Sequence, residues 1–186
     1  MRITATRLPG VMLAETDVRT DSRGAFARLY CETDLAALVG TRHIAQINQS
    51  TTLQRGAVRG LHYQRSPHAE MKLIRCVQGA AWDVAVDLRA DSPTFLNWQA
   101  VEISRDNARM VIVPEGFAHG FQALTPGCEL LYLHTKSYDP TVEGGVAWND
   151  RRIAIDWPLP IPEDGGMSDR DRGLPSLPPD FGGLTA

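Results

Sequence analysis

The chain has 186 residues, of which 43% are hydrophobic and 22% charged, with a formal net charge of -3. This ordinary globular composition predicts one domain, residues 1–186, large enough to bury a core. The slight acidity argues against nucleic-acid binding. No stretch approaches the roughly 20 apolar residues of a membrane span, and the N-terminal residues lack the apolar run of a secretory signal. We therefore expect a cytoplasmic protein without nucleic-acid or membrane partners.

The predicted elements begin with a helix from Thr33 to Val39, which Thr33 or Asp34 is expected to cap and Gly40 to end. It is the one helix that the sequence predicts. Further along, apolar residues alternate with a period of two, which is typical of β-strands. In residues 81–88, for example, Trp82 falls on one face and Asp83 on the other.

Similar alternating runs occupy residues 71–78, 97–104, 109–113, 119–124 and 129–137, and turn signals separate them. Strands this short and numerous favour an all-β fold, an antiparallel sandwich or a jelly-roll barrel. Six of the 12 prolines then follow Asp156. Residues 156–186 are therefore predicted to form an extended arm packed over the barrel.

The three cysteines are far apart and form no CxxC pair. This spacing predicts reduced, buried thiols rather than a zinc or redox site. The chain also lacks GxxxxGK[ST], GxGxxG and GxSxG, so neither a phosphate-binding loop of a known kind nor a serine nucleophile is indicated.

The densest cluster of polar residues starts with Arg-Gly-Leu-His-Tyr-Gln at 59–64 and continues through His68, Glu70 and Lys72. Polar side chains on barrel strands need partners or a ligand, because burying them unpaired is costly. On a strand, Lys72 shares a face with apolar Ile74. The alternative is a surface lysine whose stem covers apolar neighbours.

Two further segments deliver polar side chains to strands. Residues 114–121, Pro-Glu-Gly-Phe-Ala-His-Gly-Phe, form a turn that places His119 in the next strand. Tyr132 shares a face with His134 and is able to face the same cavity as His62. The alternatives are a hydrogen-bonded core histidine and a tyrosine buried for packing alone.

Groups suited to a phosphorylated ligand lie elsewhere in the chain. Arg23 and Arg59 each precede a glycine, with polar Gln46 and Asn48 between them in sequence. A guanidinium grips phosphate oxygens in bidentate fashion, although single arginines are usually solvated. The aromatic residues that offer a stacking surface for a base are Phe26 and Tyr138.

The motifs occur in a fixed order: Asp-Ser-Arg-Gly at 21–24, Gln46 with Asn48 and Ser50, residues 59–64, Lys-Leu-Ile-Arg at 72–75, residues 82–89, Ser-Pro-Thr-Phe at 92–95, residues 114–121 and Leu-Tyr at 131–132. In this combination the chain closely resembles the dTDP-4-dehydrorhamnose 3,5-epimerase family from about Leu8 to Pro158. The resemblance implies a cupin-type jelly roll, a homodimer and no metal or other cofactor. It implies a nucleotide-linked 4-keto-6-deoxyhexose as substrate.

The resemblance also implies catalytic roles. Inverting a carbon next to a ketone needs a base on one face, charge stabilisation for the enolate and an acid on the other face. His62 resembles the base, Lys72 the cation at the enolate oxygen and Tyr132 the acid. The family's carboxylate partner of the base matches the Ser-Asp-Arg-Asp stretch at 168–171, where Asp171 is favoured and Asp169 is the rival.

By the same resemblance, the remaining family positions hold substrate. His119 matches a second active-site histidine. Phe26 and Tyr138 match positions near the base of the nucleotide. The residues that match the diphosphate-binding positions are Arg23, Arg59, Gln46 and Asn48.

Some residues depart from the family pattern. Residues 25–28 are Ala-Phe-Ala-Arg, where the family commonly has Phe-Phe-Phe-Glu, so Arg28 puts a cation near the nucleotide in place of a carboxylate. Leu133 and Arg170 stand where the family has lysines. The resemblance therefore leaves the identity of the nucleotide open. It also leaves open whether C3 and C5 both invert or whether the protein is an epimerase of one carbon alone.

Three other functions could draw on some of the same residues. A metal-dependent cupin would use His62, His68, Glu70 and His119, but strand residues six apart lie about 20 Å from end to end unless the chain turns between them. A non-catalytic sugar-nucleotide binding protein would not need His62, Lys72 and Tyr132 together. A 3,4-ketoisomerase on a related jelly roll is the third.

Overall fold

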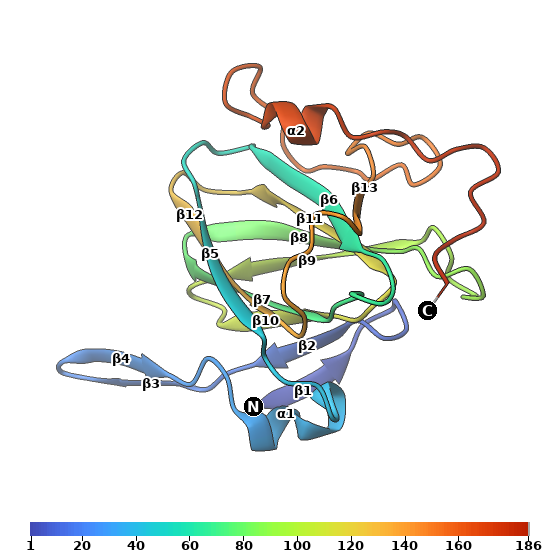
Figure 1. Ribbon diagram of the computed structural model, residues 1–186. Helices are drawn as coiled ribbons and strands as arrows, with labels where there is room; N and C mark the ends of the chain where they lie inside the picture. Colours follow the sequence, from blue (N-terminus) through green and yellow to red (C-terminus); the bar gives the residue numbers. More distant parts are fainter. Residues whose placement is uncertain (186) are drawn as a thin grey trace.

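Two antiparallel β-sheets face each other in the computed structural model, which describes residues 1–185 (Figure 1). The six-stranded sheet runs in the order β1 (Arg2–Ala5), β2 (Met12–Glu15), β10 (Arg109–Val113), β7 (Lys72–Gln78), β12 (Cys128–His134) and β5 (Gln46–Thr52). The five-stranded sheet runs in the order β13 (Glu143–Gly145), β6 (Val58–Gln64), β11 (Phe117–Ala123), β8 (Ala80–Asp87) and β9 (Trp98–Ser104). The predicted all-β sandwich is thus the observed architecture.

The core lies between the sheets. Ile74 and Cys76 of β7 pack there with Leu130 of β12, and Ala85 of β8 and Phe121 of β11 meet them from the other sheet. All five are almost fully buried. Because successive strand residues point to opposite faces, this core fixes which side chains of each strand face inward.

The outer face of the five-stranded sheet is buried as well. Trp82 and Val84 of β8 share a face, as the alternation predicted, and this face points outward and packs with Leu177 and Phe181 of the C-terminal arm. Asp83 points inward and is 1% exposed. Both faces of β8 are therefore covered, one by the opposite sheet and the other by the arm.

The predicted helix is present with a different start. Helix α1 spans Glu32–Val39, and its N-cap residue is Cys31, without a side-chain hydrogen bond. The prediction that Thr33 or Asp34 caps it is wrong, and the Asp34 carboxylate instead accepts a hydrogen bond from the N-terminal amine at 3.3 Å. The helix ends at Gly40, whose φ of 61° places it in the left-handed region that glycine tolerates.

The prediction of a single helix is wrong, because a second one, α2 (Asp169–Arg172), lies within the arm. Its first turn is capped by Ser168, whose side-chain oxygen accepts the Asp171 N–H. Four residues are too few to show a helical period, which is why the proline-rich context predicted an extended chain.

The arm crosses one end of the sandwich at α2 and then runs back along it (Figure 1). Its last part is held by an isolated bridge between Leu184 and Arg89 and by stacking of the Phe181 and Phe95 rings, 6.0 Å apart. In the part of the chain that the structure describes, no helix is long and apolar enough to cross a membrane.

One buried carboxylate ties the arm to the preceding loop. Asp150 Oδ1 accepts the N–H groups of Arg152 and Ile153 at 2.8 and 3.2 Å, and its Oδ2 accepts the Leu177 N–H at 2.7 Å. Asp150 is 3% exposed, so these donors have little access to water.

Replacing Asp150 by alanine is expected to destabilise the protein. Each buried N–H left without a partner costs about 1–3 kcal/mol, and each kcal/mol lowers Tm by roughly 2–4 °C in a chain of this size. Thermal unfolding measures the loss, with exposed Asp156→Ala as the matched control. Equal Tm values for the two variants would show that Asp150 does not anchor the arm.

Candidate active site

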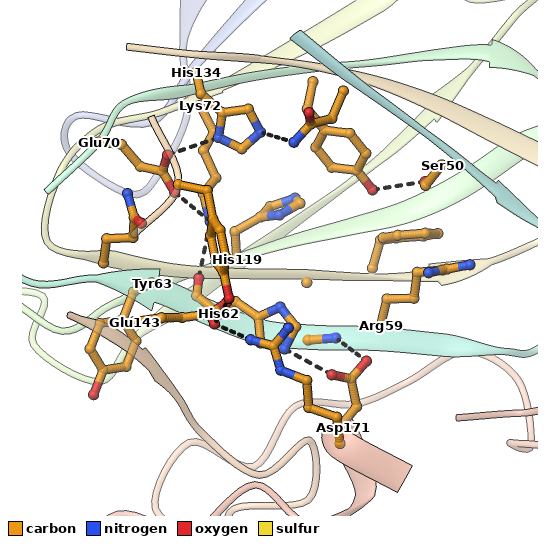
Figure 2. A pocket seen from close by; sticks show the side chains of 18 of the residues that line it. Ser50, Arg59, His62, Tyr63, Glu70, Lys72, His119, His134, Glu143 and Asp171 are labelled. Atoms are coloured by element: carbon orange, nitrogen blue, oxygen red, sulfur yellow. Dashed lines mark hydrogen bonds and ion pairs between the residues drawn. The ribbon is translucent and has the colours of Figure 1, made fainter. Parts of the chain in front are cut away.

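A cavity of about 630 Å³ opens between the two sheets next to α2 (Figure 2). One wall consists of β6 and β11 of the five-stranded sheet, and the other of β5, β7 and β12 of the six-stranded sheet. Residues from five of the ordered motifs line it, together with residues of the Ser-Asp-Arg-Asp stretch at 168–171. Their charged groups are mostly paired with one another or with neighbouring buried carboxylates.

His62, on β6, is held by a carboxylate from α2. Its Nε2 lies 2.8 Å from Asp171 Oδ1, and Asp171 Oδ2 accepts the Gly60 N–H at 3.2 Å. Asp171 is 5% exposed, whereas Asp169 is exposed and makes no contact with His62. Although burial opposes ionisation, the hydrogen bond and charge of His62 and the Gly60 N–H hold the pKa of Asp171 below its usual value.

The ammonium group of Lys72, at the start of β7, connects the two walls. Its Nζ donates to the backbone carbonyl of His62 at 3.3 Å and lies 3.3 Å from Glu70 Oε1. Glu70 Oε2 in turn accepts from Nδ1 of His134 at 2.8 Å. Burial of Glu70 raises its pKa, but the His134 hydrogen bond and the Lys72 charge outweigh this effect and leave the pKa lowered.

Tyr132, on β12, lies on the wall opposite His62. Its hydroxyl is 3.2 Å from Ser50 Oγ, and its ring stands between the rings of His119 and His134, each 6.1 Å away between centroids. Burial raises the pKa of Tyr132 well above its usual value. The phenol is therefore protonated throughout the neutral pH range and able to donate a proton.

His119, on β11, is held by a second buried carboxylate. Its Nε2 lies 2.8 Å from Asp83 Oδ2, and the two side chains are 6% and 0% exposed. The other carboxylate oxygen, Oδ1, has no hydrogen-bond partner among the described residues. The alternation placed Asp83 on the face opposite Trp82, but it gave no signal that this face is the inward one or that His119 is its partner.

The remaining cavity residues lie at its rim. Arg59 is fixed by hydrogen bonds from Nε to Thr52 Oγ1 at 3.0 Å and from a terminal nitrogen to the Thr51 carbonyl at 2.9 Å. Asn48 accepts from Gln46 Nε2 at 3.1 Å. Gln46 does not itself line the cavity, and it supports the residues that do.

Tyr138 closes another part of the rim. Its hydroxyl donates to Glu143 Oε2 at 2.8 Å, and Arg170 of α2 pairs with the same carboxylate. Its backbone N–H donates to Gln46 Oε1 at 2.9 Å. Glu143 was not among the predicted site residues, because no motif marks the short strand β13 that carries it.

Arg23 and Phe26 lie elsewhere. They belong to a hairpin of β3 (Val18–Asp21) and β4 (Gly24–Ala27) that pairs with no other strand and projects away from the sandwich (Figure 1). Phe26 is 72% exposed, and Arg23 pairs with Asp21 at 2.7 Å. Within one chain, neither residue reaches the cavity.

The four residues of the metal-dependent alternative each have separate partners. His62 contacts Asp171, Glu70 contacts His134, and His119 contacts Asp83. His68 lies outside the cavity, 3.7 Å from Asp139. Among residues 1–185, no three histidine, cysteine or acidic side chains are grouped so as to hold a metal ion.

Comparison with known proteins identifies relatives of the whole chain. The family model described as dTDP-4-dehydrorhamnose 3,5-epimerase matches residues 5–178. The chain belongs to this family. It is 39% identical over 178 residues to the dTDP-4-dehydrorhamnose 3,5-epimerase of Salmonella typhimurium, an alignment that covers 95% of this chain and 96% of that protein.

Solved structures of the dTDP-4-dehydrorhamnose 3,5-epimerase family share the fold. The Bacillus anthracis enzyme, solved with TDP and PPi bound, superposes with a TM-score of 0.88 at 41% identity and covers 95% of this chain and 99% of that one. The Legionella pneumophila enzyme, in complex with dTDP-4-keto-L-rhamnose, gives 0.87 at 36% identity, with coverage of 94% and 92%. The jelly roll predicted as cupin-type is therefore confirmed, and the chain is an isomerase of this family.

The contact between His62 and Asp171 has a measurable pH dependence. The pKa of an aspartate is about 3.9 in the unfolded chain. A carboxylate whose pKa is lower than this in the folded protein stabilises the fold at higher pH, and the stabilisation is lost as pH falls through the folded pKa. The excess unfolding free energy of wild type over Asp171→Asn is expected to be largest near pH 6 and to shrink towards about pH 3. Urea denaturation across this range, with exposed Asp169→Asn as control, measures it, and a pH-independent difference would contradict the assignment.

Proposed function

We propose that the cavity epimerises both C3 and C5 of a dTDP-linked 4-keto-6-deoxyhexose, a step of rhamnose-type deoxysugar biosynthesis in the cytoplasm. The observation that carries this proposal is the placement of two proton-transfer groups on facing walls. The His62–Asp171 pair belongs to the five-stranded side and Tyr132 to the six-stranded side, and Lys72 Nζ lies beside the His62 carbonyl. A sugar bound between the sheets would present its two faces to these groups.

In each inversion, His62 takes the proton from the carbon beside the C4 ketone. The electron pair of the broken C–H bond moves towards the ketone oxygen, giving an enolate that the ammonium group of Lys72 stabilises. Tyr132 then donates its phenolic proton to the opposite face of the same carbon, and the carbonyl re-forms. His62 and Tyr132 return to their starting states by exchanging protons with solvent.

The protein prepares each group for its role. Asp171, ionised by its contacts, orients the His62 ring and stabilises the imidazolium that forms after proton abstraction. The buried hydroxyl of Tyr132 keeps its proton until a carbanion is formed next to it, because burial disfavours the phenolate. His119, fixed by Asp83, is proposed to contact the sugar.

The rim is suited to the nucleotide diphosphate. Arg59 and Asn48 face the cavity and supply a guanidinium and an amide, two kinds of group that bind phosphate oxygens. Gln46 supports Asn48. Tyr138 is 49% exposed and offers its ring at the rim as a stacking surface for the base.

Arg23 and Phe26 enter the proposal through a second copy of the chain. The β3–β4 hairpin carries an exposed aromatic ring and an exposed guanidinium on a projection that pairs with no other strand of its own chain. In a two-fold homodimer, each hairpin would reach the cavity of the other chain and complete its nucleotide site.

The reaction is tested by incubating the protein with dTDP-4-keto-6-deoxyglucose in D₂O and following deuterium at C3 and C5 by NMR. Exchange at both carbons is expected, and exchange at one carbon alone would indicate the single-carbon epimerase.

His62→Ala is expected to lose exchange severely while its affinity for dTDP stays near that of wild type, because the base acts on the sugar alone. Equal loss of exchange and affinity would show that the role of His62 is wrong.

Tyr132→Phe separates the two faces. Proton abstraction by His62 needs no phenol, so exchange is expected to persist more than net inversion, which needs a donor on the opposite wall. NMR of deuterium content and of product stereochemistry in the same sample measures both rates. Parallel loss of the two would rule out the two-face mechanism.

The role of the hairpin is tested by mixing two inactive proteins. The Arg23→Ala/Phe26→Ala protein lacks the hairpin contacts, and His62→Ala lacks the base. A mixture allowed to exchange subunits is expected to regain activity, because some dimers then carry one cavity with both intact parts. Sedimentation measures the oligomeric state, and a monomer, or a mixture without recovered activity, would contradict the proposal.

A further inference from the structure

Glu70 and His134 line the cavity, yet the proton transfers by His62 and Tyr132 do not use them. Glu70 divides its two carboxylate oxygens between two partners, with Oε2 2.8 Å from His134 Nδ1 and Oε1 3.3 Å from Lys72 Nζ. The Glu70, His134 and Lys72 side chains are 7%, 13% and 11% exposed. Figure 2 shows the three side chains as one connected group on the side of the cavity opposite Asp171.

The ammonium group of Lys72 depends on these contacts for its position. A lysine side chain has a flexible four-carbon stem and three N–H donors. Two of the donors have protein acceptors, Glu70 Oε1 and the His62 carbonyl. One N–H therefore remains for an oxygen atom of the substrate, and the two protein contacts determine where Nζ holds it.

Glu70 is a flexible side chain too, and His134 is what orients it. The imidazole is itself confined: its ring stacks on Tyr132 at an interplanar angle of 28°, and Nε2 lies 3.5 Å from Asn48 Nδ2. Because His134 Nδ1 donates to Glu70 Oε2, the other carboxylate oxygen, Oε1, is directed to Lys72. Removing the imidazole would release the carboxylate to rotate and carry the ammonium group with it.

We propose that Glu70 and His134 are positioning residues for Lys72, with His134 orienting the Glu70 carboxylate and Glu70 fixing the ammonium group against the enolate oxygen. This inference rests on the proposed function, because it takes the enolate oxygen as the group that Lys72 meets. Neither residue needs to touch the substrate. Their loss should slow enolate formation, since a displacement of the stabilising charge by about 1 Å costs up to about 10²-fold in rate.

Three variants test this. His134→Leu removes the donor to Glu70, whereas His134→Asn keeps an N–H close to the position of Nδ1. Deuterium exchange into dTDP-4-keto-6-deoxyglucose is expected to fall about 10- to 100-fold in His134→Leu, and His134→Asn should retain most of the wild-type rate. His43→Leu, at an exposed histidine outside the cavity, is the matched control and should exchange like wild type.

Affinity for dTDP, measured by calorimetry, distinguishes positioning from binding. It should change little in His134→Leu, because the diphosphate does not meet Lys72 or Glu70 and Asn48 keeps its hydrogen bond from Gln46 when its long contact with His134 is lost. A weaker affinity with an unchanged exchange rate at saturation would make His134 a nucleotide contact and overturn the inference. Should His134→Leu fail to fold, His134→Gln replaces it, since its amide lies one bond further along and should restore less of the rate than His134→Asn.

A double-variant cycle tests the order of the contacts. If His134 acts only through Glu70, adding His134→Leu to Glu70→Ala should not lower exchange further, and multiplying losses would contradict the inference. Wild-type protein that binds dTDP but shows no exchange would contradict the proposed function and this inference with it. Equal exchange rates in wild type and His134→Leu would contradict the positioning role of His134 and leave the proposed function intact.

Discussion

The structure of the cavity depends on the buried carboxylate of Asp171. A carboxylate with 5% exposure is costly unless donors surround it. Here both donors, the His62 ring and the Gly60 N–H, come from β6, while the α2 turn that Ser168 caps carries the carboxylate itself. Satisfying this one charge requires the arm to lie across the open end of the sandwich. The same contacts orient the His62 ring, so the stability of the arm and the readiness of the base have one origin.

The pattern of a carboxylate buried beside an imidazole is repeated around the cavity. His62 has Asp171, His119 has Asp83, and His134 has Glu70. Each pair fixes which ring nitrogen faces the carboxylate and leaves the other side of the ring for a different task. The cavity is thus polar and preorganised before any ligand enters, because its charged groups are held by the protein rather than by the substrate.

The sequence was sufficient for those parts of the fold with a strict period. Strands β7 to β12 are rich in apolar residues that pack in the core, and their bounds were predicted to within a few residues. Strand β5 reads Gln-Ile-Asn-Gln-Ser-Thr-Thr and shows no such alternation, because it lies at a sheet edge beside a polar cavity. Helix α2 is too short for any period.

For the site, the sequence located the groups with distinctive motifs, and the structure places His62, Lys72, His119 and Tyr132 around one cavity. It could not supply the partners. Glu70 meets His134 across a strand pair, and Glu143 meets Arg170 across the arm, so each contact depends on register and on chain path.

The position of the arm at the end of the chain also affects the order in which the site is built. The last strand of the sandwich ends at Gly145, whereas Asp171 follows 26 positions later. During synthesis on the ribosome, both sheets are therefore made before His62 acquires its carboxylate. A nascent chain stopped between these points would possess the cavity walls without a competent His62–Asp171 pair.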